Sequence, residues 1–129
     1  MEICVTLVLS GQKVEVLVLI DSGVGGVFIN LGFVKEFGIK VDNLLTKIDI
    51  YNVDGTLNQE GLIMQEVEAS LKIQGQKTKE RFLVTALGTQ CIILGYPWLE
   101  KANPKINWKK KEFSWWNDDE EHVNIYTLL

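Results

Sequence analysis

The sequence predicts a mainly β protein, built as a barrel or a sandwich and carrying two short helices. Short apolar segments rich in β-branched residues recur along the chain, turn-forming residues separate them, and only two segments carry helix signals. With 129 residues, of which 47% are hydrophobic, the chain is the size of one domain. Such a domain can bury its core without the help of metals or disulfides.

The chain opens with a predicted β-hairpin. Residues 3–9 and 13–20 are apolar and β-branched, and Ser10-Gly11-Gln12 between them forms turns readily. The second strand ends in an uninterrupted apolar run from Leu17 to Ile20, which predicts a buried strand. A short helix should follow, with Asn30 as its N-cap. It should run through Phe33, Val34 and Phe37 and end at Gly38.

The middle of the chain contains three further predicted strands, at 47–53, 61–74 and 80–85. The Asp54-Gly55 pair predicts a hairpin turn between the first two, and Gln74-Gly75-Gln76 predicts another turn before the third.

The last third combines a buried strand, a helix and a final hairpin. Cys91 to Gly95 is the predicted strand, and Tyr96 to Ala102 is the helix, with a proline in its first turn. Asn103-Pro104 ends that helix. The expected hairpin pairs Ile106 to Trp108 with Glu112 to Trp115, and its residues Trp108 and Trp115, like Trp98 and Trp116, are expected in the core or in subunit contacts. An acidic link at 117–121 and a strand-like stretch from Val123 to Leu129 complete the chain.

Charge and composition exclude several classes of partner. Thirteen basic residues against 17 acidic ones give a net charge of −4, which argues against nucleic acid, and Lys109 to Lys111 is expected to be a solvated turn. No apolar run is long enough to span a membrane, and the first residues lack a basic leader. Cys4 and Cys91 lack C-x-x-C spacing and have apolar neighbours, so buried, reduced thiols and an intracellular protein are expected.

Most catalytic machinery is excluded by the scarcity of the residues it needs. His122 is the only histidine and lies in the acidic link, which argues against Ser-His-Asp and Cys-His catalysis and against a zinc site. Gly23, Gly25 and Gly26 follow a strand, but their spacing fits neither common phosphate-binding loop. The sequence therefore predicts no metal and no cofactor.

Carboxylate chemistry remains, and it centres on Asp21-Ser22-Gly23. An apolar strand that ends in an acid places a charge where desolvation is costly, so the carboxylate needs hydrogen bonds or a partner. The Ser22 hydroxyl can exchange hydrogen bonds with a neighbour, and Gly23 lets backbone approach the carboxylate closely. Taken alone, the tripeptide fits an ordinary turn equally well.

Three separated segments together resemble the retropepsins, the aspartic proteases of retroviruses and long-terminal-repeat retrotransposons. They are Ile20 to Gly23, the hairpin from Tyr51 to Thr56, and Ile92 to Gly95 followed by a helix. Within that group, the chain resembles the protease domain of a Ty3/gypsy-type polyprotein from about residue 3 to residue 116. The resemblance implies an all-β closed barrel with one or two short helices, a protease domain at 1–116, and a link and tail at 117–129.

Because the chain holds a single Asp-Ser-Gly, the second carboxylate of an aspartic protease should come from a second copy across a two-fold axis. The resemblance implies the same homodimer, acting as an endopeptidase on a retroelement polyprotein, in the cytoplasm or within virus-like particles. It implies an extended peptide as partner and no cofactor. The implied residues are Asp21 as catalytic; Ser22, Gly23, Leu94 and Gly95 as support for the active-site loop; and Val53, Asp54 and Gly55 as the flap over the substrate.

One departure keeps a second hypothesis open. Where the family usually has alanine after its Asp-Ser-Gly or Asp-Thr-Gly, this chain has Val24 followed by Gly25 and Gly26. The same fold can serve as a catalytically inactive dimerisation or peptide-binding module, since fold does not fix function. An unrelated small β-barrel binding protein is the third hypothesis.

Overall fold

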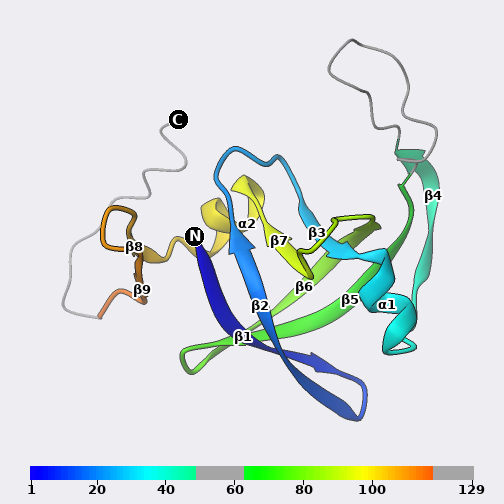
Figure 1. Cartoon of the computed structure of the whole chain (residues 1–129), viewed down its shortest axis with the longest axis horizontal. Coiled ribbons are helices and arrows are strands. Elements are labelled where there is room, and N and C mark those ends of the chain that lie inside the picture. The colour runs from blue at the N-terminus through cyan, green and yellow to red at the C-terminus, as the bar shows by residue number, and fades with distance from the viewer. Residues whose placement is uncertain (49–62, 118–129) are drawn as a thin grey trace.

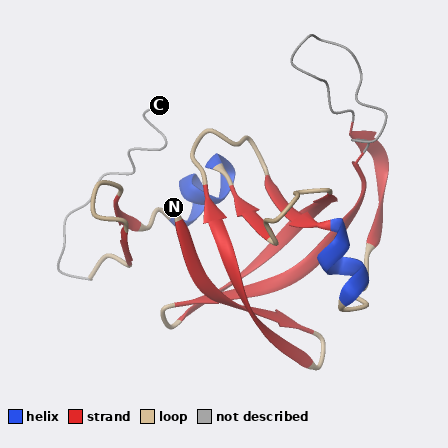
Figure 2. Cartoon of the chain, in the orientation of Figure 1, coloured by secondary structure: helices blue, strands red, loops and turns tan. Residues whose placement is uncertain are grey.

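The computed structural model describes residues 1–48 and 63–117. Its strands and helices, coloured in chain order in Figure 1 and by type in Figure 2, confirm a mainly β protein with two short helices. The elements are β1 (Glu2–Leu9), β2 (Gln12–Ile20), β3 (Val27–Asn30), α1 (Leu31–Glu36), β4 (Asp42–Ile48), β5 (Ile63–Ile73), β6 (Gln76–Thr85), β7 (Ile92–Leu94), α2 (Tyr96–Ala102), β8 (Lys105–Asn107) and β9 (Glu112–Ser114).

Six of the strands close into a barrel, which decides between the barrel and the sandwich. Neighbouring strands follow the order β1-β2-β7-β3-β6-β5, and β1 pairs with β5 to complete the ring, for example at Leu7 opposite Leu71. β4 lies outside the ring on β5. Because a closed sheet leaves few unpaired edges, this arrangement satisfies most strand hydrogen bonds internally.

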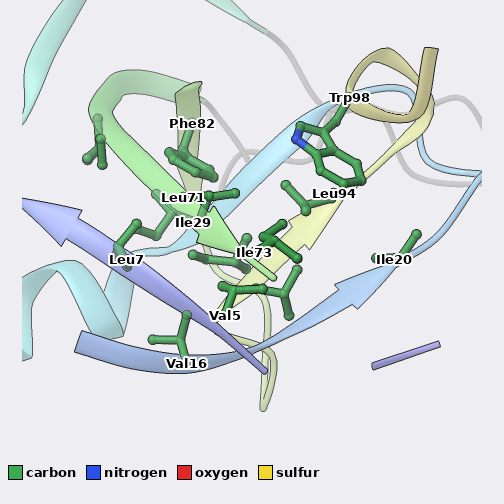
Figure 3. Packing of buried hydrophobic residues seen from close by; sticks show 14 of the residues in the cluster. Val5, Leu7, Val16, Ile20, Ile29, Leu71, Ile73, Phe82, Leu94 and Trp98 are labelled. Carbon is green, nitrogen blue, oxygen red and sulfur yellow. The ribbon is translucent and has the colours of Figure 1, made fainter. Parts of the chain in front are cut away.

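The barrel interior holds the hydrophobic core. Strand alternation sends every second side chain inward, and the buried residues of β1, β2, β5 and β7 are apolar. On β6, Phe82 and Val84 are apolar, and the buried Glu80 is the exception. Figure 3 shows how these side chains from opposite walls pack against one another and against Trp98 of α2. Each fully buried Leu or Ile side chain stabilises the folded state by about 1.5–3 kcal/mol relative to the same side chain left exposed. The largest fully buried side chains are Trp98, Phe82, Leu7, Ile20, Ile29, Ile63, Leu71, Ile92, Leu94, Leu99, Val18 and Val67.

The predicted N-terminal hairpin is confirmed, but two predictions of burial on it are wrong. β1 and β2 pair antiparallel with Cys4 opposite Leu17. Leu17 is 50% exposed and Cys4 is exposed as well. Only one face of this hairpin meets the core, and both residues lie on the other face, so an apolar run was not sufficient to predict complete burial. Both cysteines are free thiols, and Cys91 is half-buried.

The segment after Asp21 contains a strand that the sequence did not predict. β3 is only four residues long, too short for a clear alternation, and it exists because it pairs with β7 on one side and β6 on the other. The predicted cap of α1 is confirmed: the Asn30 Oδ1 accepts a hydrogen bond of 2.8 Å from the Gly32 amide. The Asn30 amide group also donates to the carbonyls of Gly88 and Gln90, at 3.0 and 2.8 Å.

Two strand boundaries differ from the prediction. β4 begins at Asp42, earlier than the predicted 47–53, because its polar first residues pair with β5. β6 begins at Gln76 instead of residue 80. Gln74 and Gly75 both have positive φ, at 44° and 85°, so a two-residue turn returns the chain directly to the sheet. The predictions for 51–60 and 123–129, and for His122, fall outside the described residues.

The C-terminal part packs an aromatic cluster against the barrel. α2 has its predicted bounds, and β8 and β9 form the predicted hairpin as a separate two-stranded sheet. The ring of Trp98 lies 6.3 Å from Phe113 and 6.4 Å from Trp115, centroid to centroid. The Trp115 indole donates to the Ile73 carbonyl at 2.8 Å, which fastens the hairpin to the barrel. Trp108 in the hairpin turn is 41% exposed.

Candidate active site

Asp21 lies immediately after β2, at the end of the buried part of that strand. Its amide donates a 3.1 Å hydrogen bond to the Leu94 carbonyl, so the backbone still follows β7 at this point. Its half-buried carboxylate accepts a 2.9 Å hydrogen bond from the Gly23 amide. The Val24 amide donates to the Asp21 carbonyl at 3.2 Å. The tripeptide is therefore a hydrogen-bonded turn that fixes the orientation of the carboxylate.

The loop from Asp21 to Gly26 rests on the start of α2. The Gly95 amide donates to the Gly26 carbonyl at 3.0 Å, and the Tyr96 amide donates to the Val24 carbonyl at 2.7 Å. A Cβ atom at residue 95 would lie 2.2 Å from the Val24 oxygen and 2.3 Å from the Gly26 oxygen, so only glycine fits there. The free amides at the beginning of a helix thus satisfy the carbonyls of the loop that carries Asp21.

The remaining loop residues differ in how closely they are packed. A Cβ atom at Gly23 would lie 3.3 Å from the Asp21 Oδ1, which is a tight contact. Ser22 is exposed, and its hydroxyl makes no hydrogen bond to another residue of the described ranges 1–48 and 63–117. A Cβ atom at Gly26 would come within 2.7 Å of the Phe28 ring, whereas one at Gly25 would meet nothing within 4 Å.

An apolar row crosses the outer face of the sheet beside Asp21. Leu19 of β2 is opposite Ile93 of β7, Ile93 is opposite Phe28 of β3, and Phe28 is opposite Leu83 of β6. All four side chains are half-buried, while their sequence neighbours point into the core. Asp21 is two residues beyond Leu19, so strand alternation directs it to the same face as the apolar row. The carboxylate therefore borders an accessible hydrophobic surface.

Five of the predicted site residues meet at one place. Asp21, Ser22 and Gly23 form the turn, and Leu94 and Gly95 support it through backbone contacts. The predicted flap residues Val53, Asp54 and Gly55 lie outside the described part of the chain.

Val24 and Gly26 stood out in the sequence as a departure from the family pattern, but their carbonyl contacts with α2 were not predicted. No site role was predicted from the sequence for Tyr96, Leu19, Phe28 and Ile93. For Leu19 and Ile93 a signal existed in the sequence, since each lies two positions before a predicted site residue, Asp21 or Gly95, as side chains on one face of a strand do. Within residues 1–48 and 63–117, no group of three or more histidine, cysteine or acidic side chains is arranged to hold a metal ion.

A closed β-barrel with Asp-Ser-Gly at the end of a core strand, backed by a glycine at the start of a helix, is a retropepsin-like domain. More narrowly, the sequence matches the PEG10/RTL1 protease domain over residues 17–122. The chain therefore belongs to that Ty3/gypsy-derived family, and the resemblance noted from the sequence is confirmed.

Solved structures support the same fold. The retroviral protease-like domain of Ddi1 from Leishmania major superposes with a TM-score of 0.64 at 17% identity, over 93% of this chain and 90% of the other. EIAV protease in complex with the inhibitor HBY-793 gives a TM-score of 0.59 at 17% identity, over 83% of this chain and 91% of the other. No curated protein matches the chain by sequence. None of the helices within the described residues is both long and apolar enough to cross a membrane.

Proposed function

We propose that this chain is an aspartic endopeptidase that works as a homodimer, with Asp21 of each subunit in a shared active site. The observation that carries the proposal is the fixed Asp21 carboxylate, held by the Gly23 amide on a loop that α2 supports, beside an open apolar surface. Catalytic groups act best when their supporting residues are already in place before substrate arrives.

The chemistry requires two carboxylates that share one proton. One carboxylate takes a proton from a water molecule as the water attacks the peptide carbonyl, and the protonated partner donates a hydrogen bond to the carbonyl oxygen. The bond to the leaving nitrogen then breaks as that nitrogen receives a proton. Ser22 and Gly23 would support the pair, Ser22 through its exposed hydroxyl and Gly23 through its amide.

A second copy is the natural source of the second carboxylate. Asp42, the other aspartate of the described residues, lies on β4 and forms an ion pair with Arg81, with 3.5 Å between the charged atoms. The β8–β9 hairpin offers a surface for the second copy, because it is two strands wide and holds the exposed Trp108 in its turn. Unpaired strand edges and exposed aromatic residues are common in subunit contacts.

The substrate we propose is an extended segment of a retroelement polyprotein, bound along the apolar row. An extended peptide alternates its side chains, so it would set every second side chain against Leu19, Ile93 and Phe28. The segment around Val53, Asp54 and Gly55 would cover the peptide as a flap. We assign the protease domain to residues 1–116 and treat 117–129 as an acidic link and tail.

Cleavage of a peptide library by the purified protein, with and without Asp21→Asn, tests the proposal. We expect cleavage by the parent protein and a loss of at least about a thousandfold in Asp21→Asn, because the amide cannot act as base. Asp42→Asn is the matched control and should retain activity. If the parent dimerises and binds peptides but cleaves none between pH 4 and pH 7.5, the inactive binding module replaces this proposal.

A further inference from the structure

The Glu80 carboxylate is the buried charge that the proposed chemistry leaves unused. Within the described ranges, Glu80 is the one buried polar or charged residue, at 5% relative exposure. It lies on the core face of β6, in the same row as Phe82 and Val84. A carboxylate there needs a partner, because an isolated buried charge is very costly.

That partner comes from the last turn of α2. The Lys101 ammonium donates to both carboxylate oxygens of Glu80 in a part-buried ion pair. Lys101 is also the basic residue that the carboxyl end of a helix favours. On the same helix, Trp98 and Leu99 are buried in the core. One helix of seven residues is therefore fixed to β6 at its end and to the Asp21 loop at its beginning.

We propose that Glu80 and Lys101 are a positioning pair for the loop that carries Asp21. A buried apolar contact between α2 and the barrel can slide, whereas a bidentate ion pair fixes the helix along its axis. A shift of α2 along that axis would move Gly95 and Tyr96, whose amides hold the carbonyls of Gly26 and Val24. The catalytic consequence rests on the proposed function; the consequence for the loop does not.

Hydrogen exchange of single amides tests the pair without relying on activity. The readout is the exchange rate of the Asp21, Val24, Gly95 and Tyr96 amides, compared with amides of the β5–β6 ladder. We use Glu80→Gln together with Lys101→Met, because replacing both charges avoids an unpaired buried ion and keeps the protein folded. We expect these four amides to exchange at least about tenfold faster than in the parent protein. The amides of the β5–β6 ladder should stay within about threefold of their parent rates.

Matched variants separate positioning from stability. Lys101→Arg keeps the charge and should leave the four rates near those of the parent. Lys79→Met removes an exposed ion pair between Lys79 of β6 and Glu68 of β5, and should leave the four exchange rates unchanged. Equal acceleration of ladder and loop amides in the double variant would mean that the pair only stabilises the fold, and would overturn the proposal. Unchanged exchange rates of the four amides in the double variant would also overturn the proposal.

Kinetics then test the catalytic consequence. In the double variant we expect kcat to fall at least about tenfold with KM nearly unchanged. A misplaced catalytic loop reduces the stabilisation of the transition state more than it reduces the affinity for substrate. Parent-like kcat with accelerated loop exchange would overturn this consequence. If the parent itself cleaves nothing, the proposed function fails, while the exchange rates still decide whether the pair positions the loop.

Discussion

The α-carbon of Gly95 lies against the carbonyl oxygen of Val24, so that a Cβ atom on residue 95 would stand 2.2 Å from that oxygen. The Tyr96 amide donates to the same oxygen at 2.7 Å. The start of α2 and the loop after Asp21 are thus in backbone-to-backbone contact, and neither can adjust by rotating a side chain.

Gly95→Ala should therefore destabilise the protein by about 2–3 kcal/mol or more, since overpacked backbone must move. Urea denaturation measures the loss. Gly25→Ala is the matched control, because its Cβ would meet nothing within 4 Å and its backbone does not need glycine. That control should be neutral or stabilising by about 0.5 kcal/mol. Equal losses in the two variants would contradict the close contact.

Gly26→Ala should alter substrate preference more than stability. The new methyl group would meet the end of the Phe28 side chain, at 2.7 Å from the Cζ atom, and that ring can rotate away. We expect a stability change below about 1 kcal/mol and a new ranking of kcat/KM among peptides that differ in one apolar side chain. Phe28→Leu should change the ranking too. An unchanged ranking in both variants would remove Phe28 from the substrate surface.

Trp108→Ala should weaken the dimer. An exposed tryptophan in a subunit contact is a frequent hot spot, and its removal typically costs about 2 kcal/mol, or roughly thirtyfold in the dimer dissociation constant. Sedimentation equilibrium measures that constant. Phe37→Ala is the control, because Phe37 is similarly exposed, at 37% against 41%, and directly follows α1, which Figure 1 shows on the opposite side of the molecule from β8 and β9. Equal effects, or a monomeric parent, would refute the hairpin contact.

Glu68 should contribute to stability at neutral pH and cease to do so in acid. A hydrogen bond from Lys79, aided by the charge of Arg81, lowers the pKa of Glu68 below its ordinary value of 4.5. A carboxyl with a lowered pKa stabilises the folded state above its unfolded pKa, and this contribution disappears as the pH falls through the folded pKa. Glu68→Gln should lower the melting temperature slightly at pH 7, and the difference from the parent should shrink as the pH falls below the unfolded pKa and through the folded one.

A pH profile of cleavage tests whether two carboxylates act together. If one proton is shared between the two Asp21 side chains, the rate should pass through a maximum on the acidic side of neutral and fall on both sides. The profile is measured as kcat/KM for one peptide between pH 3 and pH 8. A rate that only rises with pH would indicate a single general base.

The sequence by itself determined the elements with strong local signals. Helix α2 was predicted at its observed bounds because Pro97 favours the first turn and Asn103-Pro104 cannot continue the helix. The cap at Asn30 and the hairpin around Gly11 were found for the same reason, since a single residue fixes the local backbone. The Asp21 turn was also predictable, because its charge interrupts an apolar strand and glycine follows.

Tertiary structure alone decided what depends on distant strands. β3 is a strand because it pairs with β6 and β7, and its four residues are too few for a strand pattern to be recognised in the sequence. Leu17 and Cys4 are exposed because barrel closure gives the hairpin a single buried face, whereas the apolar run from Leu17 to Ile20 is equally hydrophobic on both faces. The support of the Asp21 loop by Gly95 and Tyr96 joins residues about 70 positions apart, through backbone groups that nearly every residue carries. Only the closure of the barrel brings those groups together.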